Sequence, residues 1–163
     1  IVGTMQYYAA GDSYQISGLK YREMKKDDPG NIRLLEKGVE ILPRVVTPEN
    51  LNKGVVEVIV EDDIVPLTLS DALLGTLVEI RGISVDEVYV TTKEESSSFG
   101  AMTMTCTKDG ESIQIRTLPL YEDGELLTER DFLGFVIDVT GVLDTYEGKS
   151  QIRVFSIDDI TVY

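Results

Sequence analysis

The sequence predicts an all-β protein whose main part is a closed five-stranded barrel. Two observations carry this prediction. Apolar and polar residues alternate in several segments between residues 77 and 157, which is the pattern of strands buried on one face. Glycine-containing turns separate these segments at short intervals, as expected for hairpin-connected strands. With 163 residues, 42% of them apolar, the chain can bury a core without a metal ion or a disulfide.

The first three strands are predicted between residues 77 and 116. Residues 77–85 combine alternation with β-branched side chains, and Gly82 lies where a strongly bent strand needs conformational freedom. Residues 101–107 place methionine and cysteine on one face and threonine on the other. The Asp109-Gly110 pair predicts a two-residue hairpin turn into the third strand.

The remaining elements complete the order of the barrel. Residues 124–133 predict a helical or irregular crossing, residues 135–143 a fourth strand containing a glycine, and residues 150–157 the last strand after a turn at 144–148. Three strands, a crossing and a second hairpin make up the order of an OB fold, a five-stranded Greek-key barrel. A β-sandwich contains similar short strands and is the alternative architecture.

The N-terminal third holds a partial internal repeat. Residues 2–16 resemble residues 140–154, because both contain Gly-x-apolar-x-x-Tyr, a glycine turn and Gln-Ile. The prediction is therefore that residues 1–50 are a partial OB-like repeat, a closing hairpin plus a linker, and that residues 51–163 are the OB-like barrel. An isolated hairpin is only marginally stable, so we expect this one to pair with strands outside the chain, dock on the barrel or exchange with another copy.

Between the hairpin and the barrel, three segments are predicted. Proline, asparagine and glycine mark residues 42–54 as a linker. Residues 55–60 form a strand-like lead-in to the barrel. Residues 68–74 form a short helix that ends at Gly75.

The runs at residues 64–83 and 139–152 resemble OB-fold modules of exported Bacteroidetes lipoproteins. Those modules show Pro-x-Thr before a short helix, then Gly-x-Leu-Val-x-apolar-x-Gly, and a similar last hairpin. The resemblance covers roughly residues 43–163 and the partial repeat. It implies an exported, periplasmic or cell-surface lipoprotein, anchored in the membrane only through a lipid-modified cysteine that this chain does not contain. Such modules are often labelled nucleic-acid-binding from the fold alone, and fold does not determine function.

Composition disfavours several classes of function. The net charge of −14 repels nucleic-acid phosphates and anionic membranes. The chain has no histidine and one cysteine, Cys106, which the alternation places on the buried face of a strand as an inert thiol. The acidic runs lack the spacing of a known calcium loop, and no pair of acids indicates a glycosidase. We expect no enzyme activity, no cofactor and no metal site.

Weak candidates for ligand binding come from two residue types. Exposed tyrosines bind sugars, and arginines on neighbouring strands can form a basic row, although strand packing and cross-strand ion pairs explain both. The loop at residues 86–100 also lies where OB barrels recognise ligands. The candidate residues are Tyr7, Tyr8, Tyr14, Tyr146, Arg81, Arg116 and Arg153.

The sequence therefore predicts a non-catalytic binding module. The acidic charge favours a protein or glycan partner over nucleic acid, and the N-terminal hairpin is a possible point of association. Single-stranded nucleic-acid binding is the alternative, because the fold permits it. An exposed apolar patch or an open edge strand would indicate a protein partner.

Overall fold

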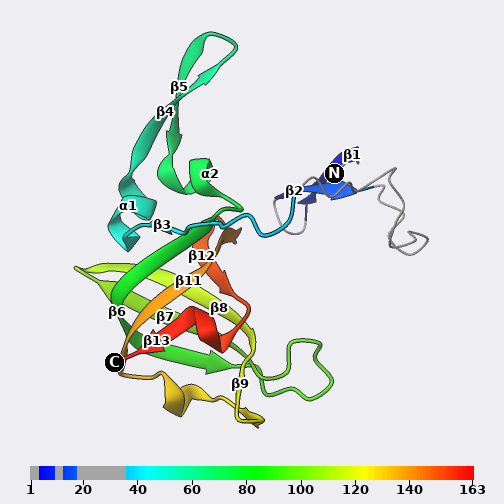
Figure 1. The fold of residues 1–163 in the computed structure, drawn as a ribbon, viewed down its shortest axis with the longest axis vertical. Coiled ribbons are helices and arrows are strands. Elements are labelled where there is room, and N and C mark those ends of the chain that lie inside the picture. Colours follow the sequence, from blue (N-terminus) through cyan, green and yellow to red (C-terminus); the bar gives the residue numbers. More distant parts are fainter. Residues whose placement is uncertain (1–3, 10–12, 18–35) are drawn as a thin grey trace. The chain divides into compact units, whose positions relative to one another are not determined.

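The computed structural model describes residues 4–9, 13–17 and 36–163. Contacts divide the chain into two compact units, of which the larger comprises Leu42–Thr145 and Lys149–Tyr163. The larger unit contains the barrel, two short helices and a separate hairpin (Figure 1).

A closed barrel of five strands confirms the predicted all-β, OB-like architecture. β6 pairs with β7, β7 with β8, β8 with β12, β12 with β11, and β11 again with β6, which closes the sheet. β12 runs parallel to β8, whereas the β6–β7, β7–β8 and β6–β11 pairs are antiparallel. The strands are β6 (Leu77–Val90), β7 (Ala101–Lys108), β8 (Glu111–Pro119), β11 (Val136–Tyr146) and β12 (Lys149–Val154).

Two glycines form the bend and the turn that the sequence predicts. Gly82 has a φ of 60° inside β6, beside a register shift in its pairing with β11, and its N–H donates to Asp138 Oδ1 at 2.7 Å. This left-handed residue bends the long strand around the barrel. Asp109 and Gly110, with φ values of 53° and 82°, form the predicted tight turn between β7 and β8.

The core lies inside the barrel, on the faces that the alternation assigned to it. Met102, Met104 and Cys106 of β7 are fully buried between threonines that lie on the outer face. The other strands contribute Val78, Ile80, Ile83, Ile113, Ile115, Ile137, Val139, Leu143, Ile152 and Val154.

The crossing between β8 and β11 is irregular. It consists of the two-residue strands β9 (Tyr121–Glu122) and β10 (Glu125–Leu126) and the 3-10 helix η2 (Glu129–Asp131). The sequence predicts either a helical or an irregular crossing here, and the structure shows the irregular one. The Asp123-Gly124 turn, with positive φ at both residues, makes a small hairpin instead. Phe132, directly after η2, is completely buried in the core.

The predicted linker at residues 42–54 is structured, so that prediction was wrong. β3 (Arg44–Val45) pairs in parallel with β6, and α1 (Pro48–Lys53) follows. Thr47 accepts a hydrogen bond from the N–H of Asn50 at 3.1 Å, and Pro48 is the first helical residue. A threonine N-cap followed by proline is a helix-start signal, which outweighs the reading of proline as a linker residue.

Helix α2 (Leu69–Leu73) confirms the short helix predicted before the barrel. Thr68 accepts from the N–H of Asp71 at 3.1 Å, and Gly75 follows with a φ of 76°. At the other end of the chain, β12 stops at Val154, and η3 (Ile157–Asp159) leads to β13 (Ile160–Val162), which pairs with β11.

At the N-terminus, β1 (Thr4–Tyr8) and β2 (Ser13–Ser17) form an antiparallel hairpin. Gly3 and Gly11, on which the internal repeat partly rests, lie outside the described residues. The hairpin agrees with the strands that the sequence pattern indicates. That it is the closing hairpin of a second, partial OB repeat stays a prediction.

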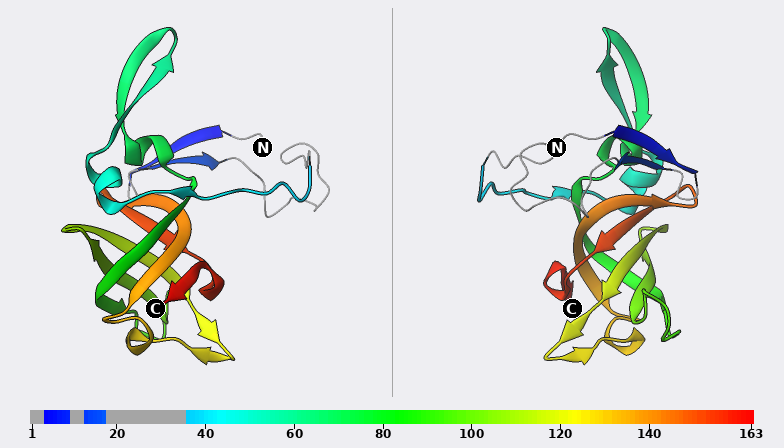
Figure 2. Two further views of the ribbon diagram at one scale, coloured as in Figure 1. Left: turned by 60° about the vertical axis from the view of Figure 1, so that its left-hand side comes forward. Right: turned by 90° about the vertical axis from the view of Figure 1, so that its right-hand side faces the viewer.

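A second hairpin, β4 (Val55–Val60) and β5 (Asp63–Thr68), is a two-stranded sheet of its own. In the views of Figures 1 and 2 it extends away from the barrel, beyond the two helices. We call it the ribbon. The lead-in strand predicted at residues 55–60 is therefore β4, but it leads into a hairpin rather than directly into the barrel.

Candidate interaction surfaces

The ribbon has a defined hydrogen-bond register. Its turn residues, Glu61 and Asp62, both have positive φ (50° and 74°), as in a two-residue hairpin turn. Antiparallel pairs alternate between hydrogen-bonded and non-bonded positions, starting with a bonded pair at the turn. Bonded pairs therefore fall at 60/63, 58/65 and 56/67. The N–H of Leu69 donates to the Gly54 carbonyl at 2.7 Å, which continues the same alternation.

This register leaves one usable edge. In the non-bonded pairs, the backbone N–H and C=O groups point away from the partner strand. On β4 these residues are Val55, Glu57 and Ile59, each with an N–H donor. On β5 the residue opposite Glu57 is Pro66, which has no N–H and interrupts that edge. In the described part of the chain, neither β4 nor β5 pairs with a third strand.

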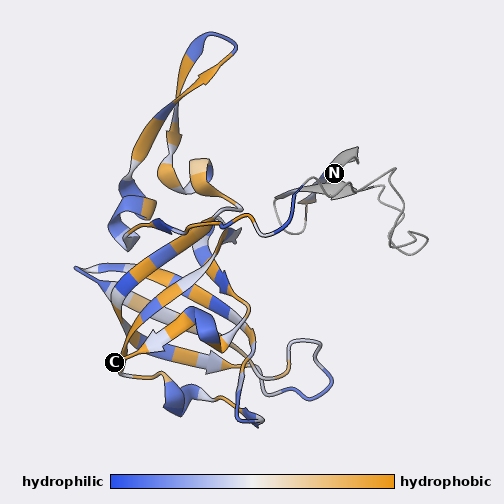
Figure 3. Ribbon diagram, in the orientation of Figure 1, coloured by the Kyte–Doolittle hydropathy of each residue, from blue (hydrophilic) through white to orange (hydrophobic). Residues whose placement is uncertain are grey.

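Both faces of the ribbon are mostly apolar. One face carries Val56, Val58, Val60, Val65 and Leu67 with Asp63 at the turn, and the other carries Val55, Ile59, Ile64 and Pro66 together with Glu57 and Thr68. Ile59 is 77% exposed and Ile64, directly opposite it, 66%. Figure 3 shows the apolar colouring along both strands. Contiguous exposed apolar surface of this kind marks an interaction site in a soluble domain.

The charged residues of the ribbon are all acidic. Glu57 lies on the open side of β4, and Glu61, Asp62 and Asp63 form the tip, while residues 55–68 contain no lysine or arginine. In the sequence these three consecutive acids lack the spacing of a calcium loop and indicated no site. In the structure they form the turn that brings two apolar strands together.

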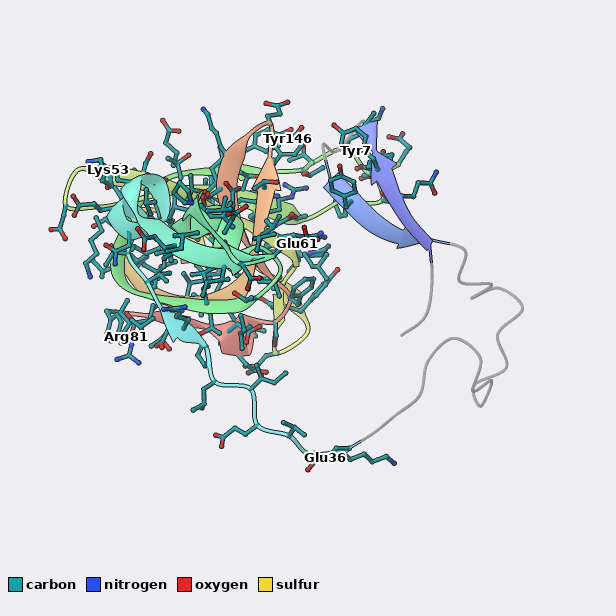
Figure 4. All side chains as sticks on the ribbon, turned by 90° about the horizontal axis from the view of Figure 1, so that it is seen from above. Tyr7, Glu36, Lys53, Glu61, Arg81 and Tyr146 are labelled. Atoms are coloured by element: carbon teal, nitrogen blue, oxygen red, sulfur yellow. The ribbon has the colours of Figure 1, made fainter. Side chains whose placement is uncertain are left out.

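The predicted arginines separate into a pair and a single residue. Arg116 of β8 and Arg153 of β12 lie opposite each other in parallel register on the outer surface of the barrel. Arg81 lies elsewhere, at the outer surface of β6 (Figure 4), where it binds both carboxylate oxygens of Glu79 at 2.7 and 2.9 Å. These hydrogen bonds raise the pKa of Arg81. The pair is within one strand rather than between strands.

The Arg116–Arg153 pair lines a small depression of about 90 Å³. The ends of β8 and β12 form two sides, and Ser97 and Ser98 of the loop before β7 form another. Arg153 also lies over the ring of Phe155, with its guanidinium carbon 5.7 Å from the ring centroid. The loop that the sequence singled out thus contributes two hydroxyl groups to the same place as two predicted arginines.

The predicted tyrosines are exposed in every case. Tyr7 and Tyr14 face each other across the β1–β2 hairpin, with ring centroids 5.3 Å apart and planes inclined by 54°. This geometry is a cross-strand aromatic pair, which stabilises a hairpin without a ligand. Tyr8 follows on the same strand, and Tyr146 ends β11.

Sequence reasoning missed two features of these surfaces. β5 went unrecognised because Pro66 interrupts its alternation, although an acidic turn between two apolar runs was the available signal. Phe155 was not singled out because the predicted last strand ran through it to residue 157, whereas β12 stops at Val154 and leaves Phe155 exposed just beyond it.

No helix in the described ranges has the length and apolar character needed to cross a membrane. Among those same residues, no three potential metal ligands lie close enough together to hold an ion. Comparison of the sequence with models of known protein families and with curated protein sequences gives no match.

Proposed function

We propose that this chain is a non-catalytic protein-binding module, and that the outer edge of β4 binds an extended segment of its partner as an added strand. One observation carries the proposal: a two-stranded sheet, mostly apolar on both faces, has an open edge with three outward-pointing N–H groups. Strand addition uses such an edge for main-chain hydrogen bonds and its faces for side-chain contacts.

The charge of the ribbon specifies the partner. Four acids and no bases on the ribbon, in a chain of net charge −14, favour a partner strand in which apolar residues alternate with lysine or arginine. The same charge opposes pairing with a second copy of the chain. It also opposes single-stranded nucleic acid, the rival function. Export and lipid anchoring, which the resemblance to lipoprotein modules implies, belong to this proposal as the setting of the intact protein.

The test is a titration of a fluorescent ten-residue peptide that alternates valine and lysine, followed by anisotropy. Proline at position 57 removes an outward N–H without breaking a hydrogen bond of the ribbon, because Glu57 occupies a non-bonded pair, and it also removes the carboxylate. We expect Glu57→Pro to weaken binding by about tenfold or more, the equivalent of about 1.4 kcal/mol. Glu57→Gln, which removes the charge and keeps the N–H, is expected to lose less.

Two controls separate edge pairing from non-specific attraction. Ile64→Pro blocks the opposite edge, which Pro66 already interrupts, and Ile64→Ala removes the same apolar side chain but keeps the N–H; the two variants are expected to bind within a factor of two to three of each other. A measurement at high salt separates main-chain pairing from charge attraction, because salt screens exposed charges. Binding through main-chain hydrogen bonds should persist there, whereas binding through charge alone should be lost. Equal binding by the wild type and Glu57→Pro, or concentration-dependent dimers of the free protein in sedimentation, would contradict the proposal.

A further inference from the structure

Two cations face each other on the barrel surface with little to neutralise them. Ile115, Ile152 and Val154 are buried, so strand alternation directs Arg116 and Arg153 outward. Like charges directly opposite each other in a sheet are destabilising. In a chain with 29 acids and 15 bases, such a pair stands out as a local excess of positive charge.

The neighbouring groups orient these arginines without cancelling their charge. Arg116 is half-buried and donates to Thr103 Oγ1 at 2.7 Å, and among the described residues it forms no ion pair. Arg153 has one carboxylate near it, Asp144, with a separation of 3.6 Å between Nη1 and Oδ2. In the described part of the chain, one carboxylate therefore pairs with Arg153, and none pairs with Arg116. A guanidinium presents paired N–H donors that match the two oxygens of a carboxylate.

The depression beside the pair limits the size of the ligand. Its volume of about 90 Å³ is far below the roughly 300–1,000 Å³ of a site for a whole drug-sized ligand, so it holds one functional group and its immediate neighbours. Ser97 and Ser98 supply hydroxyl groups, which match a ligand that itself carries hydroxyls. Phe155 is half-exposed and supplies an apolar ring at the rim.

We propose that the Arg116–Arg153 depression binds the carboxylate of an acidic sugar, a hexuronate residue of a glycan. The guanidinium groups bind the carboxylate, the serine hydroxyls contact the sugar hydroxyls, and the part of the Phe155 ring that Arg153 does not cover contacts the apolar face of the sugar. A polyphosphate chain presents the same kind of charge but extends over the acidic surface, which repels it. This site is on the barrel and does not depend on the edge of β4.

The test is a titration of isotope-labelled protein with digalacturonate, followed by amide chemical shifts in NMR spectra. Shifts are expected at residues 97–98, 116–118 and 153–155. Arg116→Ala is expected to weaken binding about tenfold or more. Arg116→Lys keeps the charge but loses the paired donors, so its affinity is expected to lie between those of Arg116→Ala and the wild type. Arg81→Ala removes the same charge from a distant exposed site and is expected to leave the affinity unchanged.

Three comparison ligands test which chemical group the site recognises. A neutral digalactose tests the need for the carboxylate, an acidic dipeptide tests sugar against peptide, and a short oligothymidine tests phosphate. Digalacturonate is expected to bind at least about tenfold more tightly than each of them, the equivalent of about 1.4 kcal/mol. Equal binding of any of the three, an equal loss in Arg81→Ala, or no shifts at millimolar digalacturonate would overturn the proposal.

Discussion

Cys106 gives a prediction whose magnitude follows directly from its environment. The thiol lies on the inner face of β7 and is fully buried. Burial raises its pKa from 9.0 to about 12, and the negative charge of Asp86 acts in the same direction. At pH 8, the reactive thiolate is therefore about one part in ten thousand in the folded protein, against about one in ten in the unfolded chain. The expected difference in reactivity is about a thousandfold.

The assay is the rate of reaction with an aromatic disulfide reagent at pH 8, in native buffer and in denaturant. One thiol should react rapidly in denaturant and at least about a thousand times more slowly in native buffer. The unfolded chain loses the thiol proton at lower pH than the folded protein, so the unfolded state binds fewer protons between pH 9 and 12. Stability should therefore fall as pH rises through this window, by up to about 1.4 kcal/mol per pH unit. A native rate within tenfold of the denatured rate would refute the reasoning, since it would show that burial in β7 does not protect the thiol.

Two further substitutions test the barrel itself. Phe132→Ala removes a completely buried ring from the crossing segment and should lower the free energy of unfolding by about 3–5 kcal/mol in a denaturant titration; a change below about 1 kcal/mol would show that Phe132 does not fill the core. Gly141→Ala places a methyl group 2.5 Å from the Arg153 carbonyl oxygen and 2.6 Å from Ile152 Cγ2, so it should destabilise the β11–β12 contact by about 1–3 kcal/mol; an unchanged thermal midpoint would contradict the close approach of these strands.

The barrel could be predicted because its signals are local. Alternation assigned Met102, Met104 and Cys106 to the inside, and Asp109-Gly110 specified the turn between β7 and β8. The bend at Gly82 was likewise visible, because only glycine adopts positive φ in a strand without strain. Strand order then followed from the succession of hairpins and the single crossing.

The structure of residues 42–68 was predicted less well, for physical reasons. α1 depends on a cap at Thr47 and on contacts with a distant hairpin, where Asn52 Nδ2 donates to Glu111 Oε2 at 3.1 Å and Lys53 pairs with the same carboxylate. Those hydrogen bonds lower the pKa of Glu111. The exposure of the ribbon is also invisible to alternation, because both of its faces are mostly apolar and such a pattern normally indicates a buried strand.

The candidate surfaces were likewise predicted only in part. Sequence reasoning selected Arg116 and Arg153, but only the parallel register of β8 and β12 shows that they meet and that Arg81 does not. The open edge of β4 follows from two facts: the register decides which residues point their N–H groups outward, and Pro66 interrupts the edge of the partner strand. Neither property can be read without knowing which strands pair.

The most direct measurement of the central claim is amide hydrogen exchange of the ribbon, resolved by NMR, with and without the valine–lysine peptide. In the free protein, the amides of Val56 and Val58 should be protected by β5, and those of Glu57 and Ile59 should exchange freely. Adding the peptide should protect Glu57 and Ile59 and leave the β5 edge unchanged. Protection that appears at Ile64 instead, or no change in exchange at a peptide concentration that saturates binding, would contradict strand addition at β4.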